Sequence, residues 1–330
     1  MINKAGTVRE TKALAKKFVR YKEGAELYSM GHSKFEKLAK EAKATYKVNG
    51  IVLVNCEIFE KYLGKYRRKY MSKIIAIANQ KGGCGKSTTA VNLGIGLVRK
   101  GKRVLIVDAD PQGSASICLG INEPDELDYT LANAMLDVIN DEEIDYEKLI
   151  HHHCEGVDFI PANIELSGLE VSMVNVMSRE MVMKCLLGEL TEQYDVILID
   201  CMPSLGVITI NALTCANSVI IPSQAAYLPV KGLQQLIKTI SRVKKQINPG
   251  LTIEGLLLTM VDMRSNYTKD IIEALGNTYG ESIRIFDNKI PMSVRAAETS
   301  AVGKSIYTHD AKSKVAKSYE LLTEEVLENE

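Results

Sequence analysis

The sequence predicts a chain of two parts, a small winged-helix-like domain at residues 1–70 and an α/β unit at residues 71–330. The α/β unit is expected to contain a mostly parallel sheet with helices on both faces. Three observations lead to this prediction. The first is that the two parts differ in charge, and the second is that the first part contains two helix signals followed by a hairpin signal. The third is that buried apolar runs alternate with helical segments in the second part. These apolar runs lie at residues 74–78, 104–107, 196–199, 218–222 and 253–259.

Charge separates the two parts of the chain. Residues 1–70 hold 17 Lys and Arg against 7 Asp and Glu, a net charge of +10, whereas residues 71–330 hold 24 against 34, a net charge of −10. A basic piece joined to an acidic one is typical of a nucleic-acid-binding module attached to another function. A Lys-rich solvated surface would give the same count, so charge alone leaves both interpretations open.

The composition excludes several classes of protein and of binding site. The seven Cys form no CxxC pair, which argues against a disulfide framework and a zinc site and favours a reducing cytoplasm. No apolar run approaches the ~18 residues that a membrane span needs, so no membrane partner is expected. The run at residues 151–154, His-His-His-Cys, is interpreted as a surface loop because adjacent side chains rarely point at one ion.

The basic part contains a helix, a turn and a second helix. Residues 23–30 are expected to form a short helix that Gly31 ends, and Ser33 is expected to cap a second helix at residues 34–43. In a helix-turn-helix the second helix enters the major groove of DNA.

A hairpin follows the second helix. Two β-rich runs within residues 45–54 flank Asn49-Gly50, a dipeptide favoured in type I′ turns, and Asn55 can cap a last helix. Helix-turn-helix plus hairpin is the winged-helix layout, and residues 20–65 resemble excisionase-like, MerR-related domains of mobile genetic elements. The alternative is a small helical module for protein contacts. The residues expected to face DNA are Ser33, Lys34, Lys37 and Lys47.

The acidic part begins with a strand, a glycine-rich loop and a helix. Gly82, Gly83 and Gly85 allow consecutive backbone N–H groups to surround phosphate oxygens at a helix N-terminus. Lys86 would reach the β- and γ-phosphates of ATP, and the Ser87 hydroxyl would bind Mg²⁺. The expected ATP contacts of this loop are Lys81, Gly82, Gly83, Gly85, Lys86, Ser87 and Thr88.

A second lysine, Lys81, opens this loop as KGGCGKS, which resembles the deviant Walker A motif of the ParA/MinD superfamily. The segments VDADPQG, with Asp110, and YDVILIDCMP, with Asp200, are similar to the motifs of its Soj-like branch. The resemblance implies that Lys81 contacts the nucleotide bound by a partner subunit and acts in catalysis with Lys86. It also implies that Asp110 positions the attacking water and belongs, with Ser87 and Asp200, to the residues at the Mg²⁺, which Asp200 holds through water.

The resemblance extends from Met71 to the C-terminus and implies a function. Similar proteins are slow Mg²⁺-dependent ATPases that bind DNA nonspecifically as ATP-bound homodimers and are released by a ParB-type partner. Such proteins move plasmids, chromosomes or mobile elements and are cytoplasmic and nucleoid-associated. The alternative is a site-specific transcription or excision regulator that is switched by nucleotide.

Four further residues follow from this resemblance. Arg264 and Arg295 match the positions that contact DNA, and Pro291 and Ser293 lie in the segment that borders the adenine. Met292-Ser293 stands where the family has Arg-Asn, so the base contacts here differ from the family pattern.

Overall fold

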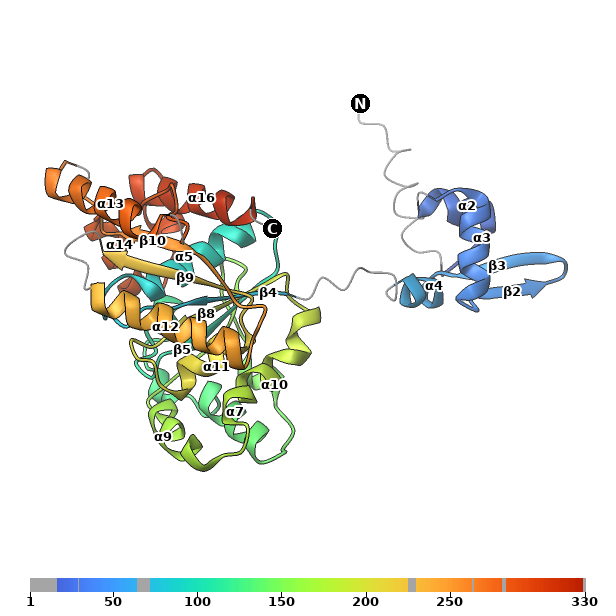
Figure 1. Cartoon of the computed structure of the whole chain (residues 1–330). Coiled ribbons are helices and arrows are strands. Elements are labelled where there is room, and N and C mark those ends of the chain that lie inside the picture. The colour runs from blue at the N-terminus through green and yellow to red at the C-terminus, as the bar shows by residue number, and fades with distance from the viewer. Residues whose placement is uncertain are drawn as a thin grey trace. The chain divides into compact units, whose positions relative to one another are not determined.

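The structure, a computed structural model, describes residues 17–28, 30–63, 72–224, 230–262, 264–280 and 283–328. Contacts divide the chain into two compact units, Met1–Tyr70 and Met71–Glu330 (Figure 1). The division falls where the sequence changes from basic to acidic. Residues 64–71, where a linker between the two units is expected, lie outside the described residues.

A seven-stranded sheet forms the centre of the large unit, in the order β10-β9-β4-β8-β5-β7-β6. All neighbouring strands pair in parallel except β6 and β7, which are antiparallel. This confirms the predicted mostly parallel α/β fold. The strands are β4 (Lys73–Ile77), β5 (Val104–Ala109), β6 (His151–His152), β7 (Asp158–Ile160), β8 (Val196–Cys201), β9 (Ser218–Gln224) and β10 (Thr252–Thr259).

Helices cover both faces of this sheet, because its central strands carry apolar side chains in both directions. Ile75 and Ile77 of β4 pack toward α5 (Lys86–Arg99) and α16 (Lys314–Leu327), whereas Ile74 and Ala76 belong to the core of the opposite face. The first face also has α6 (Ser114–Cys118), α14 (Val294–Val302) and α15 (Ile306–His309). The opposite face has α7 (Leu131–Ile139), α9 (Glu165–Ser172), α10 (Val182–Gly188), α11 (Val207–Cys215), α12 (Val230–Gln246) and α13 (Asn266–Tyr279).

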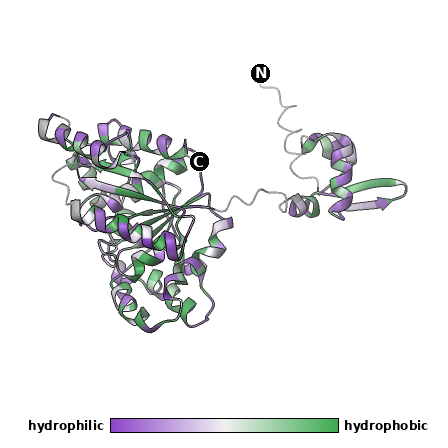
Figure 2. Cartoon of the chain, in the orientation of Figure 1, coloured by the Kyte–Doolittle hydropathy of each residue, from purple (hydrophilic) through white to green (hydrophobic). Residues whose placement is uncertain are grey.

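Short helical segments connect these elements. They are η1 (Pro124–Glu126), α8 (Tyr146–Leu149), η2 (Met173–Asn175), η3 (Arg179–Met181) and η4 (Glu189–Glu192). Figure 2 shows the surface helices striped with apolar and polar residues, as expected for helices with one face on a core. Within the described part of the chain, the helices are all too short or too polar to cross a membrane.

The prediction of a surface loop at residues 151–154 is wrong in part. His151–His152 forms the edge strand β6, which pairs with β7, and the His152 imidazole Nδ1 lies 2.6 Å from the Asp158 carboxylate. Two residues are too few to show a strand pattern in sequence. Among the described residues, no group of three His, Cys, Asp or Glu side chains could hold a metal ion.

The small unit has a three-stranded antiparallel sheet in the order β1-β3-β2 with helices beside it. The Phe35 and Phe59 rings, 4.7 Å apart between centroids, lie at the centre of its core. The elements are β1 (Phe18–Val19), α2 (Tyr21–Leu27), α3 (His32–Glu41), β2 (Thr45–Val48), β3 (Ile51–Asn55) and α4 (Cys56–Leu63).

The hairpin prediction is confirmed in the small unit. Asn49 and Gly50 both have positive φ, 47° and 81°, as a type I′ turn requires. The Asn55 side chain caps α4 by accepting a hydrogen bond of 3.1 Å from the Ile58 N–H. These features agree with the expected layout, and the assignment as a winged helix stays a prediction.

The predicted helix bounds in the small unit are wrong by two to three residues. Helix α2 ends at Leu27, and α3 begins at His32 with Gly31 as its N-cap, so Ser33 lies inside the first turn and caps nothing. The extended Gly31 provides the carbonyl that accepts the Phe35 N–H, which starts the helix early. Helix α3 also ends early, because Lys43 has a left-handed φ of 54°.

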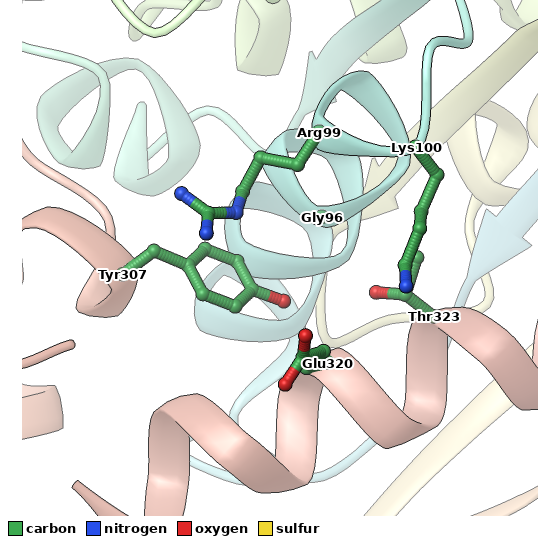
Figure 3. Close-up of a pocket in the computed structure, with 6 residues that line it drawn as sticks. All are labelled: Gly96, Arg99, Lys100, Tyr307, Glu320 and Thr323. Carbon is green, nitrogen blue, oxygen red and sulfur yellow. The ribbon is translucent and has the colours of Figure 1, made fainter. Parts of the chain in front are cut away.

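The C-terminal end of α5 packs closely against α15 and α16 at a glycine. A Cβ on Gly96 would lie 2.3 Å from the Thr323 Oγ1 and 2.7 Å from the Tyr307 hydroxyl. The three residues help to line a pocket of about 250 Å³ (Figure 3), in which the Arg99 guanidinium carbon lies 5.0 Å from the centroid of the Tyr307 ring. Close approach of two helices therefore requires glycine at this position.

Gly96→Ala is expected to lower the free energy of unfolding by about 1–3 kcal/mol, because the added methyl group overpacks a buried contact. The matched control is Gly276→Ala in α13, where an added Cβ meets no atom within 4 Å. The control should be neutral or stabilising, since alanine favours helix over glycine. Urea unfolding of both variants measures the difference, and equal stabilities would contradict this explanation of Gly96.

Candidate functional site

The candidate site lies where the parallel strands end. Strands β10, β9, β4, β8 and β5 are consecutive in the sheet and all parallel, so their carboxyl ends share one edge of the sheet. Such an edge is the usual ligand-binding position in open α/β sheets. The glycine-rich loop leaves β4 at this edge and leads into α5.

The loop conformation depends on its glycines. Gly83 and Gly85 have φ of 66° and 84°, a left-handed conformation that residues with a Cβ rarely adopt, and Gly85 is the N-cap of α5. The loop borders a cavity of about 440 Å³. The cavity is lined by Gly82, Gly83, Gly85, Lys86, Ser87, Thr88, Asp110, Ser114, Ile117, Cys118, Pro203, Met260 and Ser300.

The structure thus brings most of the predicted phosphate-binding residues to one cavity. Lys86 is buried, and in the described part of the chain its Nζ donates a hydrogen bond of 3.4 Å to the Lys81 carbonyl. A long hydrogen bond to one neutral carbonyl compensates a buried ammonium poorly. An anion in the cavity would satisfy this charge.

Two buried aspartates lie side by side at the ends of β5 and β8, where Asp108 pairs in register with Asp200. Asp108 is fully bonded: its carboxylate accepts hydrogen bonds from the Ser116 N–H at 2.8 Å and the Ser116 hydroxyl at 2.7 Å. Burial raises the pKa of Asp108 to about 6. Asp108 therefore fixes the start of α6.

Asp200 differs because neither of its buried carboxylate oxygens has a hydrogen-bond partner of normal geometry. Burial and the nearby Asp108 carboxyl raise the pKa of Asp200 well above its ordinary value, and the Ser87 hydroxyl and the Lys86 ammonium act in the opposite direction. The Asp200 oxygens are therefore short of hydrogen-bond donors, although the Lys86 ammonium acts on the carboxylate. Asp200 is not among the described residues that line the cavity.

Asp110 lines the cavity directly. It lies just beyond β5, is 8% exposed, and its Oδ1 accepts a hydrogen bond of 3.0 Å from the Gln112 N–H. This turn fixes the carboxylate at the cavity wall. Asp110 is the one carboxylate among the described residues that border the cavity, so it is the candidate for orienting a water molecule there.

Lys81 lies beside the loop rather than in the cavity lining. Its Nζ donates a hydrogen bond of 2.7 Å to Oε1 of Gln224, whose Nε2 donates to the Gly83 carbonyl at 2.8 Å. The Thr259 hydroxyl similarly donates to the Cys84 carbonyl at 2.8 Å. The sequence analysis missed Gln224 and Thr259, although each ends a parallel strand next to the loop, and that position was a usable signal.

The predicted adenine segment lies next to β10. Val261 and Pro291 form a parallel bridge, and the Met292 N–H donates to the Val261 carbonyl at 3.2 Å. Pro291 lines a separate cavity of about 350 Å³, and neither it nor Ser293 lines the phosphate cavity.

The two predicted DNA-contacting arginines follow this bridge. Arg264 comes three residues after Val261, and Arg295 comes four residues after Pro291. The Arg264 side chain is 92% exposed and bonds to Asp262 at 3.1 Å, and Arg295 is 62% exposed and bonds to Glu298 at 3.0 Å. Both guanidinium groups are available at the surface with weak local partners.

In the small unit the predicted DNA contacts lie on two elements. Ser33, Lys34 and Lys37 belong to α3, and Lys47 belongs to β2. All four side chains are exposed, while Phe35 of the same helix is buried. A helix with one buried and one basic exposed face can present cations to a phosphate backbone.

Comparisons with known proteins follow the division into two units. Residues 72–253 match the family model described as an AAA domain, and residues 16–66 match a family of unknown function, DUF6462. The sporulation initiation inhibitor protein Soj of Bacillus subtilis is 43% identical over 259 residues, which cover 78% of this chain and all of Soj. The chromosome partitioning protein ParA of Myxococcus xanthus is 41% identical over 261 residues, 79% of this chain and 89% of ParA.

Solved structures agree with these relatives. Cobyrinic acid a,c-diamide synthase from Mycobacterium smegmatis, with bound ADP and magnesium, has a TM-score of 0.69 at 34% identity and covers 78% of this chain and 95% of its own. A plasmid partition protein from Borrelia burgdorferi has a TM-score of 0.61 at 26% identity and covers 78% of this chain and 99% of its own. From its match to Soj and ParA, we conclude that the chain belongs to the Soj/ParA family of partition ATPases, with the P-loop fold of the ParA/MinD type.

Proposed function

We propose that this protein is a Mg²⁺-dependent ATPase that dimerises on ATP, binds DNA as a dimer and partitions a plasmid, a chromosome or a mobile element. The observation that carries the proposal is the phosphate loop, which places buried Lys86 at a cavity beside Asp110, with Lys81 at its outer edge.

The residues present fit a magnesium ion. Mg²⁺ prefers oxygen ligands and commonly keeps several waters. The Ser87 hydroxyl would bind it directly, and Asp200, with two buried oxygens in need of a partner, would hold it through water. When bound with ATP, the ion neutralises charge on the phosphates during transfer. The solved synthase and its ATP-analogue complex both contain magnesium, which supports this assignment.

The protein side chains at the cavity suit slow hydrolysis. Lys86 neutralises phosphate charge, and Lys81 of a second subunit would add to it across a dimer interface. Asp110 would orient the attacking water, and it is the one carboxylate on the described cavity wall. A site with positioning groups and no strong base turns over slowly, which suits a switch that a ParB-type partner triggers.

An exposed apolar surface supports dimerisation. Five large apolar side chains with 44–92% exposure lie on the neighbouring elements α7, α9 and η2 or beside them. Apolar surface of this kind is typical of an interface with another protein. The residues are Leu136, Ile164, Val171, Val174 and Met177.

The small unit would add DNA binding of its own. Its net charge of +10 and the exposed lysines on α3 and β2 support a contact with phosphates, and Ser33 lies where base edges can be read. If this contact dominates, the protein is a nucleotide-switched, site-specific regulator instead. A metabolic ligase, such as the synthase with the same fold, would turn over ATP with a small molecule and without DNA.

Lys81→Ala is expected to abolish ATP-dependent dimerisation while leaving nucleotide binding to the monomer, because only the contact with the partner's nucleotide is removed. Asp110→Ala is expected to leave a persistent ATP-bound dimer, because hydrolysis can no longer end it. Light scattering with ATP measures both, and Lys312→Ala is the control at an exposed lysine. A dimer of normal affinity from Lys81→Ala would contradict the role in trans.

Arg264→Glu and Arg295→Glu are each expected to weaken ATP-dependent binding to random DNA by about tenfold or more at low fixed salt, since each reverses a phosphate contact. Lys148→Glu, at an exposed site on α8, is the control. Binding is measured with ATP, ADP and no nucleotide, on random DNA and on DNA from upstream of the coding sequence. Unchanged affinity would remove the assignment, and tight binding at one site regardless of nucleotide would favour the regulator.

Asp200→Asn is expected to stabilise the protein without Mg²⁺ and nucleotide by about 1–3 kcal/mol at pH 7.5, because it removes a buried carboxyl that lacks a partner. The raised pKa means that the folded protein keeps a proton that the unfolded chain loses above about pH 4, so wild-type stability falls as pH rises through this interval. The stabilisation by Asp200→Asn relative to wild type should therefore be smaller at pH 5 than at pH 7.5. Urea unfolding at both pH values measures it, with Asp110→Asn as control, and a destabilised Asp200→Asn at pH 7.5 would contradict it.

A further inference from the structure

Lys81 is held by its own subunit at three points, one through its side chain and two through its backbone. Its Nζ donates to Gln224 Oε1 at 2.7 Å, its backbone N–H donates to Asn79 Oδ1 at 3.1 Å, and its carbonyl accepts from Lys86 Nζ at 3.4 Å. The half-buried ammonium therefore lies against the end of β9 and not over the open cavity. The proposed contact with a partner's nucleotide requires it to leave this place.

Gln224 is the residue that holds the ammonium. It is the last residue of β9, and its amide nitrogen donates to the Gly83 carbonyl at 2.8 Å and to Met260 Sδ at 3.1 Å. Only the nitrogen of an amide can donate, so the Gly83 carbonyl fixes which way the amide is turned. This orientation leaves Oε1 facing Lys81, where it accepts from the ammonium.

The backbone next to this amide is strained. Met260 directly follows β10 and has a φ of 52°, a left-handed conformation that is uncommon for a residue with a side chain. This turn carries the Met260 sulfur to the Gln224 amide and its side chain to the cavity wall. Strain of this kind persists where the surrounding structure fixes it and is found often at functional sites.

Gln224 supports the loop through the Gly83 carbonyl, and other residues support it as well. The Thr259 hydroxyl donates to the Cys84 carbonyl at 2.8 Å, and the Asn79 amide donates to the Pro222 carbonyl at 2.6 Å. Neither of these two bonds touches the Lys81 side chain. Among the described residues, Gln224 is the one whose side chain bonds to the Lys81 ammonium.

We infer that Gln224 is a positioning residue that keeps Lys81 in its own subunit until ATP is bound by both subunits of the dimer. The inference rests on the proposed role of Lys81 in trans. The ammonium exchanges one acceptor, the Gln224 amide oxygen, for another, the phosphate of the nucleotide in the partner subunit. Because each dimer releases two lysines, the strength of this hydrogen bond enters the dimerisation equilibrium twice. Gln224 thus shifts the equilibrium between monomer and ATP-bound dimer toward the monomer.

Two substitutions at Gln224 test this in opposite directions. Gln224→Leu removes the acceptor, so the ATP-bound dimer should become about tenfold tighter, and Gln224→Glu supplies a charged acceptor, so the dimer should become about tenfold weaker at low salt. Thr259→Val is the matched control, since it removes the other strand-to-loop hydrogen bond and leaves Lys81 bonded. The dimer dissociation constant is measured by analytical ultracentrifugation of the full chain with a non-hydrolysable ATP analogue. ADP affinity of the monomer reports whether the loop is intact.

A second measurement does not depend on dimerisation. The acylation rate of Lys81 in the nucleotide-free full chain, followed by mass spectrometry with a succinimidyl ester, should rise several-fold in Gln224→Leu and fall in Gln224→Glu. Opposite shifts in both measurements, with Thr259→Val near wild type, support the inference. Shifts in the same direction for both Gln224 variants, or none, overturn it and leave Gln224 as a loop support. If Lys81→Ala still dimerises with ATP, the proposed role in trans fails instead, and the acylation rates alone then decide whether Gln224 holds the lysine.

Discussion

The structure depends on a balance of buried charges at the edge of a parallel sheet. Lys86 and Asp200 are both buried, and their opposite charges act on one another. Among the described residues, however, Lys86 Nζ has one long hydrogen bond to a carbonyl, and the Asp200 oxygens have no hydrogen-bond partner of normal geometry. Buried charges that are left in this state cost free energy of folding. The fold tolerates them because the register of β5 and β8 and the loop after β4 fix them rigidly. A ligand that brings phosphate and a divalent cation would satisfy both groups at once.

In the proposed dimer, the same loop would connect nucleotide binding to the association of subunits. Its inner lysine, Lys86, lies in the cavity, and its outer lysine, Lys81, lies against Gln224 at the neighbouring strand end. Gln224 also bonds to the Gly83 carbonyl, so a loop that rearranges around phosphate also changes the surroundings of Lys81. One short segment can therefore report the presence of nucleotide to a second subunit without movement of the sheet.

More of the large unit than of the small unit could be predicted from the sequence, for a physical reason. Long buried strands such as β5 and β8 require near-continuous apolar runs, and the loop requires glycines at fixed positions, so both leave strong patterns. Edge strands of two residues such as β6 leave none. The start of α3 depends on the carbonyl of Gly31, which no side-chain preference reveals. Gln224 was missed because its role arises from a hydrogen bond across 141 positions of the chain to Gly83.

The division of charge between the two units gives the proposed dimer a further consequence. Each small unit is basic and carries exposed lysines on a single short helix and a strand, and in the proposed function these lysines would form a small contact surface for DNA. Two such contacts joined in one molecule bind more tightly than either alone, because the second becomes an intramolecular event. Dimerisation of the ATPase unit would therefore raise the occupancy of the small units on DNA. In that case partition and site-specific regulation would both depend on ATP-dependent dimerisation, and Lys81 would control both through its contact with the partner's nucleotide.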